Sequence, residues 1–180
     1  MFHLSKYFIP DVYLENIYAI DFKNLKEQKS IKGIILDLDN TIVPWGTKNL
    51  DEGVVSWIEQ AKQSGIKICI VSNTHHNISG IASKLDLPYL YSRYKPWRGP
   101  FLKAMEIMNT SNNETAVVGD QIFTDVLGGN ILHLLTILVS PLSKSDSFGT
   151  AIISRTMERF VMSKNIKNGK IELTRGKWPR

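Results

Sequence analysis

Two carboxylates and a hydroxyl follow one apolar stretch in the first quarter of the chain, at a spacing that suits chemistry. Ile34 to Leu36 run directly into Asp37 and Asp39, and Thr41 comes two residues later. The apolar run predicts a strand buried on both faces, and carboxylates at the end of such a strand are costly unless they pair or bind a metal. Because ligands of open α/β sheets bind at the carboxyl edge of the sheet, Asp37 and Asp39 are the first candidates for a site.

The same residues also fit a purely structural role. An Asp-rich turn that ends a strand, with Asn40 and Thr41 as local caps, would have the same sequence. The choice between a site and a turn therefore depends on what stands at the ends of the other strands.

Short apolar runs alternate with amphipathic segments along the chain. This alternation predicts an α/β protein with a three-layer α/β/α, Rossmann-like fold and a mainly parallel sheet. Strands are expected at 33–37, 66–71, 87–91, 115–118 and 134–139. Helices are expected at 22–27, 51–64, 76–84, 101–108, 124–130 and 150–162, with a loop at 95–100 between Pro96 and Pro100 and short helices or loops over the sheet in the first twenty residues.

Polar and charged residues follow the other predicted strands as well. Ser72 and Asn73 come after the strand at 66–71, Lys95 after 87–91, and Asp120 and Asp125 after 115–118. Parallel strands end at one edge, so these residues should converge with the first pair. An Asp-rich turn has no need of such partners, and the ordered set favours a site.

The converging side chains form a coherent phosphoryl-transfer site. The carboxylates of Asp37, Asp39 and Asp120 would repel one another unless a cation lay among them, and Mg²⁺ prefers such oxygen ligands. The Ser72 hydroxyl and the Lys95 ammonium could hold the oxygens of a phosphoryl group. One carboxylate can act as nucleophile and another can move the proton.

Four sequence motifs resemble, in order, motifs I to IV of the haloacid dehalogenase (HAD) superfamily. They are DLDNT at 37–41, VSN at 71–73, KP at 95–96 and GDQIFTD at 119–125. The chain is also similar to the YqeG-type family of subclass IIIA phosphatases, which is related to phosphatidylglycerophosphate phosphatases. This second likeness involves PD at 10–11, GDQIFTDVLGGN at 119–130 and ILVSP at 137–141.

The resemblance implies a role for each motif residue. Asp37 would be the nucleophile that forms an aspartyl-phosphate, Asp39 the general acid and base, and Lys95 the group that neutralises their charge. The metal site for Mg²⁺ would comprise Asp37, Asp39 through its backbone carbonyl, Asp120 and, as a supporting acid, Asp125. Substrate contacts would come from Ser72, Asn73 and Thr41, the last by shaping the motif I loop.

The spacing of the motifs predicts an open site without a sizeable cap domain. A domain needs at least about 50 residues, and neither the stretch from Thr41 to Asp51 nor that from Asn73 to Lys95 is long enough. A single hydrolase domain is expected over 1–180, with 1–30 an N-terminal extension packed on the core and 163–180 a basic tail. An open site suits a phosphate on a large or membrane-borne substrate, such as phosphatidylglycerophosphate.

Composition limits the setting of the protein. The single cysteine, Cys69, lies in an apolar run and is expected in the core, and a reducing, cytoplasmic location is the simplest expectation. No apolar run reaches the roughly 18 residues that span a bilayer. The net charge of +5 is concentrated towards the C-terminus. A phosphorylated substrate and an anionic membrane surface are the candidate partners, nucleic acid is the weaker one, and the oligomeric state stays open.

Two other functions compete with that of a phosphatase. A non-catalytic protein of the same fold could bind RNA or a membrane through the basic tail, although it would have no need of the acids. A signalling receiver domain also uses an aspartate, a hydroxyl and a lysine. It places its phosphoacceptor after the third strand, however, whereas the acid pair here follows the first predicted strand.

Overall fold

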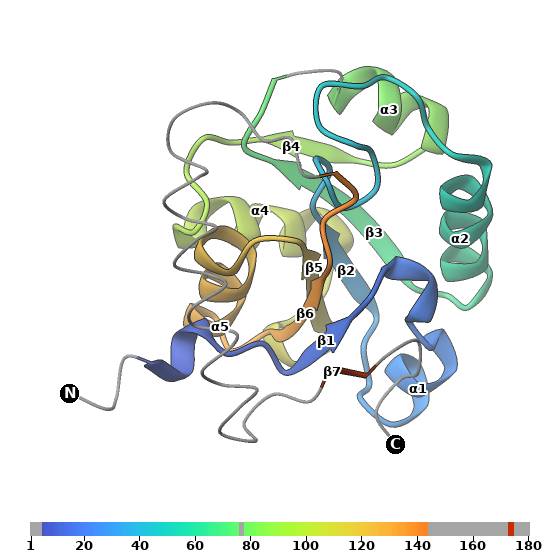
Figure 1. Cartoon of the computed structure of the whole chain (residues 1–180). Helices are drawn as coiled ribbons and strands as arrows, with labels where there is room; N and C mark the ends of the chain where they lie inside the picture. Colours follow the sequence, from blue (N-terminus) through green and yellow to red (C-terminus); the bar gives the residue numbers. More distant parts are fainter. Residues whose placement is uncertain (1–4, 76–77, 144–172, 175–180) are drawn as a thin grey trace.

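The computed structural model describes residues 5–75, 78–143 and 173–174, and it is built on one parallel sheet (Figure 1). The seven strands lie in the order β4-β3-β2-β5-β6-β1-β7, and every strand pair in the described residues is parallel. The strands are β1 (Val12–Leu14), β2 (Gly33–Leu36), β3 (Lys67–Ser72), β4 (Tyr89–Tyr91), β5 (Thr115–Gly119), β6 (Leu135–Val139) and β7 (Leu173–Thr174).

Helices cover both faces of this sheet (Figure 1). They are α1 (Phe22–Glu27), α2 (Glu52–Gln63), α3 (Ile78–Leu85), α4 (Arg98–Met108) and α5 (Leu127–Ile131). Four single turns complete the described part: η1 (Ser5–Phe8), η2 (Ile17–Ala19), η3 (Asn112–Glu114) and a π-helical turn, η4 (Ile122–Val126). No helix in this part of the chain is both long and apolar enough to cross a membrane.

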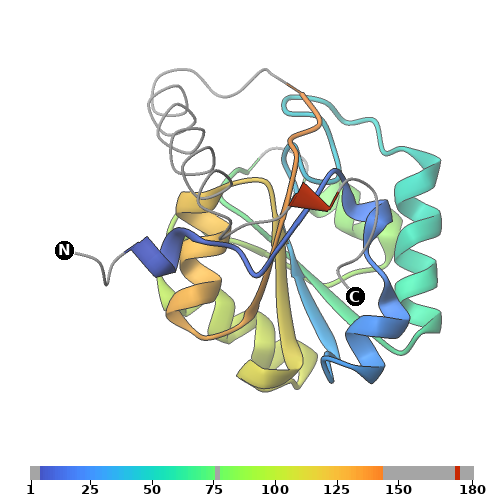
Figure 2. The same cartoon turned by 60° about the horizontal axis from the view of Figure 1, so that its bottom comes forward.

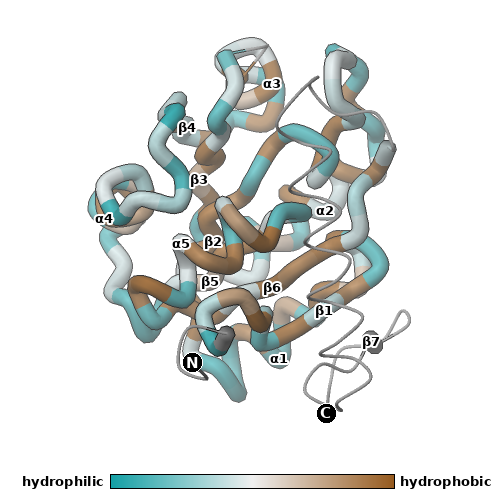
Figure 3. Tube along the Cα trace, turned by 60° about the vertical axis from the view of Figure 1, so that its left-hand side comes forward, coloured by the Kyte–Doolittle hydropathy of each residue, from teal (hydrophilic) through white to brown (hydrophobic). Residues whose placement is uncertain are grey.

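The alternation of side chains along β2 divides the core into two halves. Ile34 and Leu36 are buried together with α1, α2 and α3, whereas Ile35 is buried on the other face, against α4. Successive residues of a strand point to opposite faces, so a strand buried on both faces must be apolar throughout. Figure 3 shows the result, with hydrophobic strands inside. The predicted three-layer α/β/α fold is confirmed.

Local signals place most element boundaries where the sequence predicted them. The Asp21 carboxylate caps α1 by accepting from the Asn24 backbone N–H at 3.0 Å. The Asp51 carboxylate accepts from Gly53 N–H at 2.8 Å at the start of α2. Gly65, after α2, has a φ of +77°, a left-handed conformation that favours glycine.

The helix α4 begins earlier than predicted. The predicted loop extended from 95 to 100, but the helix starts at Arg98, so Pro100 lies in its first turn. A proline is tolerated there because the first N–H groups of a helix have no intrahelical partner. Reading Pro100 as a helix breaker was therefore wrong.

The N-terminal segment belongs to the sheet, whereas the sequence predicted only short helices or loops over it. β1 pairs with β6 over Val12–Leu14, and Leu14 is fully buried. The Asp11 carboxylate fixes the start of β1 by accepting from the backbone N–H of Thr136 at 2.8 Å and from its hydroxyl at 2.9 Å. A strand of three residues is too short to be recognised by its periodicity.

The C-terminal predictions lie almost entirely outside the described residues. These are the helix at 150–162 and the basic tail at 163–180, of which the structure describes residues 173–174 alone. Those two residues form β7 beside β1, at the edge of the sheet (Figure 2).

Strand order defines where a ligand crevice should lie. From β2 the chain moves outward through β3 to β4, then returns to β5 on the other side of β2 and continues to β6. In open α/β sheets, ligands bind at the carboxyl ends of the strands where the order reverses in this way. That point lies between β2 and β5, directly before Asp37 and Asp120.

Candidate active site

The turn after β2 holds the first aspartate rigidly. The Asp37 backbone N–H donates to the carbonyl of Val118 at 2.9 Å, which ties the end of β2 to β5. The chain then turns at Asn40, whose φ is +60°. The hydroxyl of Thr41 donates to Asp37 Oδ2 at 3.0 Å, and both side chains are buried. Thr41 therefore shapes the loop and contacts the carboxylate directly.

Lys95 joins two buried aspartates, one directly after β2 and the other on η4. Its Nζ lies 2.6 Å from Asp37 Oδ1 and 2.8 Å from Asp125 Oδ1. Burial alone would lower the pKa of Lys95, but the neighbouring carboxylates of Asp125 and Asp37 outweigh that effect and raise it above its usual value. Lys95 is thus a permanent cation that neutralises the charge of this centre.

A glycine makes room for Asp125. A Cβ on Gly119 would lie 2.3 Å from the Asp125 carboxyl carbon, so no larger residue fits without displacing that carboxylate. The π-helical turn η4 carries Asp125, and the Gln121 backbone N–H donates to its Oδ2 at 3.3 Å. Burial and the nearby Asp37 carboxylate raise the pKa of Asp125, while Lys95 opposes this shift.

Three carboxylates could hold a metal ion. Asp37, Asp120 and Asp125 are buried, and each offers one oxygen within 4.8 Å of the others. Three hard oxygen donors at the switch point of the sheet suit Mg²⁺, which binds through few carboxylates and keeps several waters. This donor set matches three of the four predicted ligands, and the residues present fit the ion.

Asp39 points to a separate group of hydroxyls. Its Oδ2 accepts from Ser72 Oγ at 3.3 Å and from the hydroxyl of Thr74. Burial raises the pKa of Asp39, the Thr74 hydrogen bond opposes the shift, and the Asp37 charge adds to it. The Asp39 carboxylate therefore lies outside the three-carboxylate group. Metal binding through its backbone carbonyl stays a prediction.

The loop after β3 supplies one residue that the sequence did not single out. The Thr74 backbone N–H donates to Ser72 Oγ at 3.1 Å, and its hydroxyl reaches Asp39. Asn73, expected among the substrate contacts, accepts from the Lys95 backbone N–H at 3.2 Å. Asn73 thus positions Lys95, and its predicted role toward substrate is untested. Thr74 could have been found as a second hydroxyl two residues after Ser72.

A catalytic thiol is excluded at Cys69. The residue is fully buried in β3, in the cluster beneath α4. Burial raises the pKa of its thiol to about 12, so the reactive thiolate does not form near neutral pH. Cys69 is a core residue, as the sequence predicted.

A family model for haloacid dehalogenase-like hydrolases matches residues 43–132. The probable phosphatase YqeG of Bacillus subtilis (strain 168) is 39% identical over 170 residues, which are 94% of this chain and 98% of that protein. This chain belongs to the haloacid dehalogenase-like hydrolases. The predicted YqeG-type family and the predicted enzyme class, a phosphatase, are confirmed with it.

Three further likenesses are more distant. A family model described as mitochondrial PGP phosphatase matches residues 1–84. The phosphatidylglycerophosphate phosphatase 1, chloroplastic/mitochondrial, of Arabidopsis thaliana is 25% identical over 91% of this chain and 50% of its own length. A crystal structure of an uncharacterized protein from Listeria monocytogenes serotype 4b has a TM-score of 0.52 with 16% identity, and covers 74% of this chain and 99% of that one. The last likeness concerns the fold alone.

Proposed function

We propose that this HAD-type phosphatase hydrolyses phosphomonoesters with Mg²⁺, through an aspartyl-phosphate on Asp37. One observation carries the proposal. Asp37 is buried at the switch point of the sheet, with one carboxylate oxygen on Lys95 and the other on Thr41. Lys95 and Thr41 orient the carboxylate, and Lys95 compensates the negative charge of the reacting centre when the carboxylate attacks phosphorus. Positioning and charge compensation are the main requirements of phosphoryl transfer.

The metal site of the proposal consists of Asp37 and Asp120, with Asp125 beside them. Mg²⁺ would neutralise phosphoryl oxygens and align the phosphorus with the attacking carboxylate. Asp125 then has two tasks, because it lies within reach of the ion and also contacts Lys95 at 2.8 Å. The predicted ligand set of Asp37, Asp39, Asp120 and Asp125 is retained, with Asp39 acting through its backbone carbonyl.

Asp39 would move the proton in both half-reactions. It first protonates the leaving alcohol as the bond between that oxygen and phosphorus breaks, and it then takes a proton from the water that attacks the aspartyl-phosphate. The raised pKa of Asp39 supports the first task, because the carboxyl keeps its proton at a higher pH than a free aspartate does. Ser72 and Thr74 hold the carboxyl in place.

The substrate we propose is a phosphomonoester on a lipid, with phosphatidylglycerophosphate as the leading candidate. The support is the similarity to a phosphatidylglycerophosphate phosphatase and an uncapped site. In the residues described between Thr41 and Lys95, the chain forms the elements α2, β3, α3 and β4 and no inserted domain. A lipid-borne phosphate can approach such a site from the membrane surface.

Asp37→Asn is the decisive variant for the proposed nucleophile. We expect hydrolysis of p-nitrophenyl phosphate in the presence of Mg²⁺ to fall by roughly four to six orders of magnitude, because an amide cannot form the acyl phosphate. The matched control is Asp86→Asn, an aspartate whose side chain is fully exposed after α3. Full activity in Asp37→Asn, with an unchanged circular dichroism spectrum, would overturn the mechanism.

A further inference from the structure

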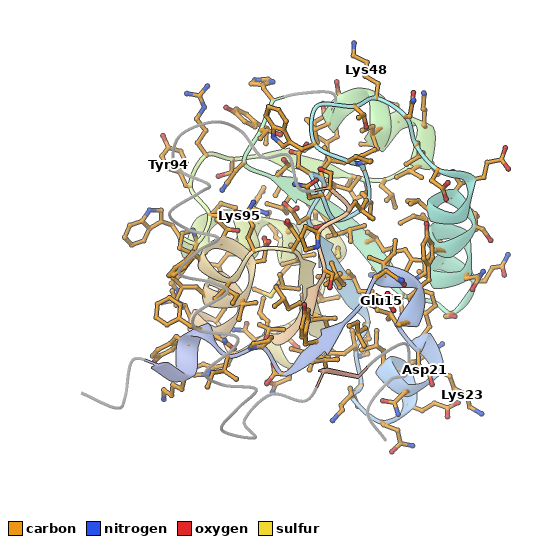
Figure 4. The ribbon with its side chains drawn as sticks, in the orientation of Figure 1. Glu15, Asp21, Lys23, Lys48, Tyr94 and Lys95 are labelled. Atoms are coloured by element: carbon orange, nitrogen blue, oxygen red, sulfur yellow. The ribbon has the colours of Figure 1, made fainter. Side chains whose placement is uncertain are left out.

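Two aromatic and two cationic side chains project from the loop that carries Lys95. Tyr94 and Trp97 are 69% and 71% exposed, the highest values among the large hydrophobic side chains of the described residues. Arg93 and Arg98 beside them are exposed as well. We refer to Arg93, Tyr94, Trp97 and Arg98 as the site rim. In Figure 4, Lys95 lies within the molecule, whereas Tyr94 lies at its periphery.

Among the described residues, the local hydrogen bonds of this loop do not involve the Trp97 side chain. Trp97 precedes α4 as its N-cap but makes no side-chain capping hydrogen bond. The loop is instead held by its backbone, through the bond from Lys95 N–H to Asn73 and that from Ser92 N–H to the Ser72 carbonyl at 2.9 Å. Exposed aromatic side chains on a well-anchored loop, bordered by charge, are typical of an interaction surface.

A shallow hollow lies beside the rim, with a volume of about 400 Å³. Its lining residues are His75, Tyr91, Ser92, Arg93 and Tyr94. The rings of His75 and Tyr91 lie 4.0 Å apart, and Arg93 Nε contacts the Tyr91 hydroxyl, which leaves the guanidinium at the wall of the hollow. Hydroxyls, an imidazole and a guanidinium around one hollow suit a phosphate group.

The charge of the rim has a single sign. No acidic residue occurs in the sequence between Asp86 and Glu106, whereas the exposed cations Arg93 and Arg98 do. An anionic surface would therefore meet attraction along the whole loop, and lipid surfaces attract such basic segments. Tyrosine and tryptophan favour the level of the lipid headgroups, because their apolar ring faces the lipid there while their polar group stays in contact with water.

We propose that the site rim docks this enzyme on an anionic lipid surface, with a headgroup phosphate in the adjoining hollow. The proposal rests on the proposed function in one respect, since it explains how a lipid-borne phosphomonoester reaches Asp37. A lipid surface is favoured over RNA because the aromatics stand on one projecting loop beside a single small hollow. RNA binding requires a groove that follows the strand, with successive stacking platforms.

Co-sedimentation of the full-length protein with vesicles tests the docking surface. The vesicles contain phosphatidylcholine alone or equal parts of phosphatidylcholine and phosphatidylglycerol. We expect binding to the mixed vesicles only, weakened by salt. Arg98→Ala should reduce the partition coefficient roughly fivefold and Arg93→Ala/Arg98→Ala about twenty-five-fold, as expected for loss of attraction by single surface cations. Tyr94→Ala/Trp97→Ala should reduce it at least tenfold.

Matched controls come from outside the site rim and its hollow. Lys23→Ala removes an exposed cation from α1, on the opposite side of the molecule in Figure 4, and Tyr18→Ala removes an aromatic side chain of η2 that is 50% exposed. Both should bind like the wild type. All rim variants should keep wild-type hydrolysis of p-nitrophenyl phosphate, which shows that Lys95 is still in place.

The outcomes separate the docking surface from the proposed function. Asp37→Asn should still sediment with the mixed vesicles even though it is inactive. Equal sedimentation of the wild type and Tyr94→Ala/Trp97→Ala would overturn the rim proposal, as would equal binding to both kinds of vesicle. The alternative result is that a single-stranded RNA binds the enzyme in a way that depends on Trp97 and so displaces it from the vesicles. That result would also overturn the rim proposal, in favour of nucleic acid. None of these results depends on whether Asp37 is the nucleophile.

Discussion

A single lysine balances the charge of two buried aspartates in this protein. The side chains of Lys95, Asp37 and Asp125 are at most 10% exposed, and the contacts of 2.6 and 2.8 Å keep all three in one arrangement. Buried charges are tolerated only when they are paired, and removing one partner of a buried pair costs about 3–5 kcal/mol. In the proposed mechanism Lys95 therefore links catalysis and stability, so its substitution would report on both at once.

Asp39 offers a cleaner test of chemistry at the residue scale. In Asp39→Ala, nitrophenol still leaves without an acid, but water is no longer deprotonated to attack the aspartyl-phosphate. We expect a burst of nitrophenol stoichiometric with enzyme, followed by turnover roughly 10²–10⁴-fold slower than in the wild type. Stopped-flow absorbance measures both phases. Asp37→Asn, which cannot form the intermediate, should show no burst. Slow turnover of Asp39→Ala without a burst would contradict the assignment.

At the scale of elements, the junction from β5 to η4 sets the position of Asp125. Gly119 ends the strand, Asp120 follows it, and the π-helical turn brings Asp125 back over Gly119. Such wide turns occur often at functional sites. The second glycine contact nearby is similar, because a Cβ on Gly128 would lie 2.4 Å from the Phe101 ring. The segment from Gly119 to Gly128 is thus held at both ends by a side chain that packs directly against a glycine backbone.

Gly119→Ala should damage the site through crowding alone. The added methyl group must displace the Asp125 carboxylate, so we expect a loss of about 1–3 kcal/mol in the free energy of unfolding and at least a tenfold loss of activity. Urea denaturation and nitrophenyl phosphate hydrolysis measure the two effects. The control is Gly80→Ala in α3, where no atom lies within 4 Å of the added Cβ. It should stabilise the protein by about 0.5–1 kcal/mol. Equal behaviour of the two variants would refute the crowding argument.

The contribution of the N-terminal strand β1 to stability can also be tested. Leu14 is fully buried in β1, whereas the adjacent Glu15 is exposed. Leu14→Ala should lower the free energy of unfolding by about 2–5 kcal/mol, since it leaves a cavity in the core cluster that Leu14 shares with α1 and α2. Glu15→Ala should change it by no more than about 0.5 kcal/mol. If urea denaturation gave similar values for both, the N-terminal segment would be a dispensable extension.

At the scale of the whole molecule, the site exists because strands from distant parts of the sequence end together. Asp37 follows β2, Ser72 ends β3, Lys95 follows β4 and Asp120 follows β5. The side chains of all four are buried, although they lie at the edge of the sheet. Assembly of the proposed metal site therefore requires the folded sheet.

Binding of Mg²⁺ should consequently stabilise the folded protein. An ion that binds only the native state at a hundred times its Kd contributes about 2.7 kcal/mol, equivalent to a rise in Tm of about 5–10 °C for a chain of this size. Differential scanning calorimetry with Mg²⁺ and then EDTA measures the shift. Asp120→Asn should abolish most of it, and Asp86→Asn should retain it. An Asp120→Asn protein with the full shift would place the ion elsewhere.

Much of the fold follows from local patterns in the sequence. The apolar run at β2 and the capping residues Asp21 and Asp51 correctly located their elements, because burial on two faces and unpaired helix N–H groups leave clear signals. The three residues of β1 left none. They are strand only because the exposed edge of β6 is available to pair with them.

The sequence by itself determined which residues could do chemistry. Acids, a hydroxyl and a lysine after successive strands must meet at one edge, since parallel strands share a direction. Only the tertiary structure shows which contacts each of these residues makes. Lys95 contacts Asp125 as well as Asp37, Asp39 points to Ser72 and Thr74, and Asn73 holds the lysine loop. Spacing along a chain fixes which edge a residue reaches, but the direction of each side chain depends on neighbours that only folding brings close.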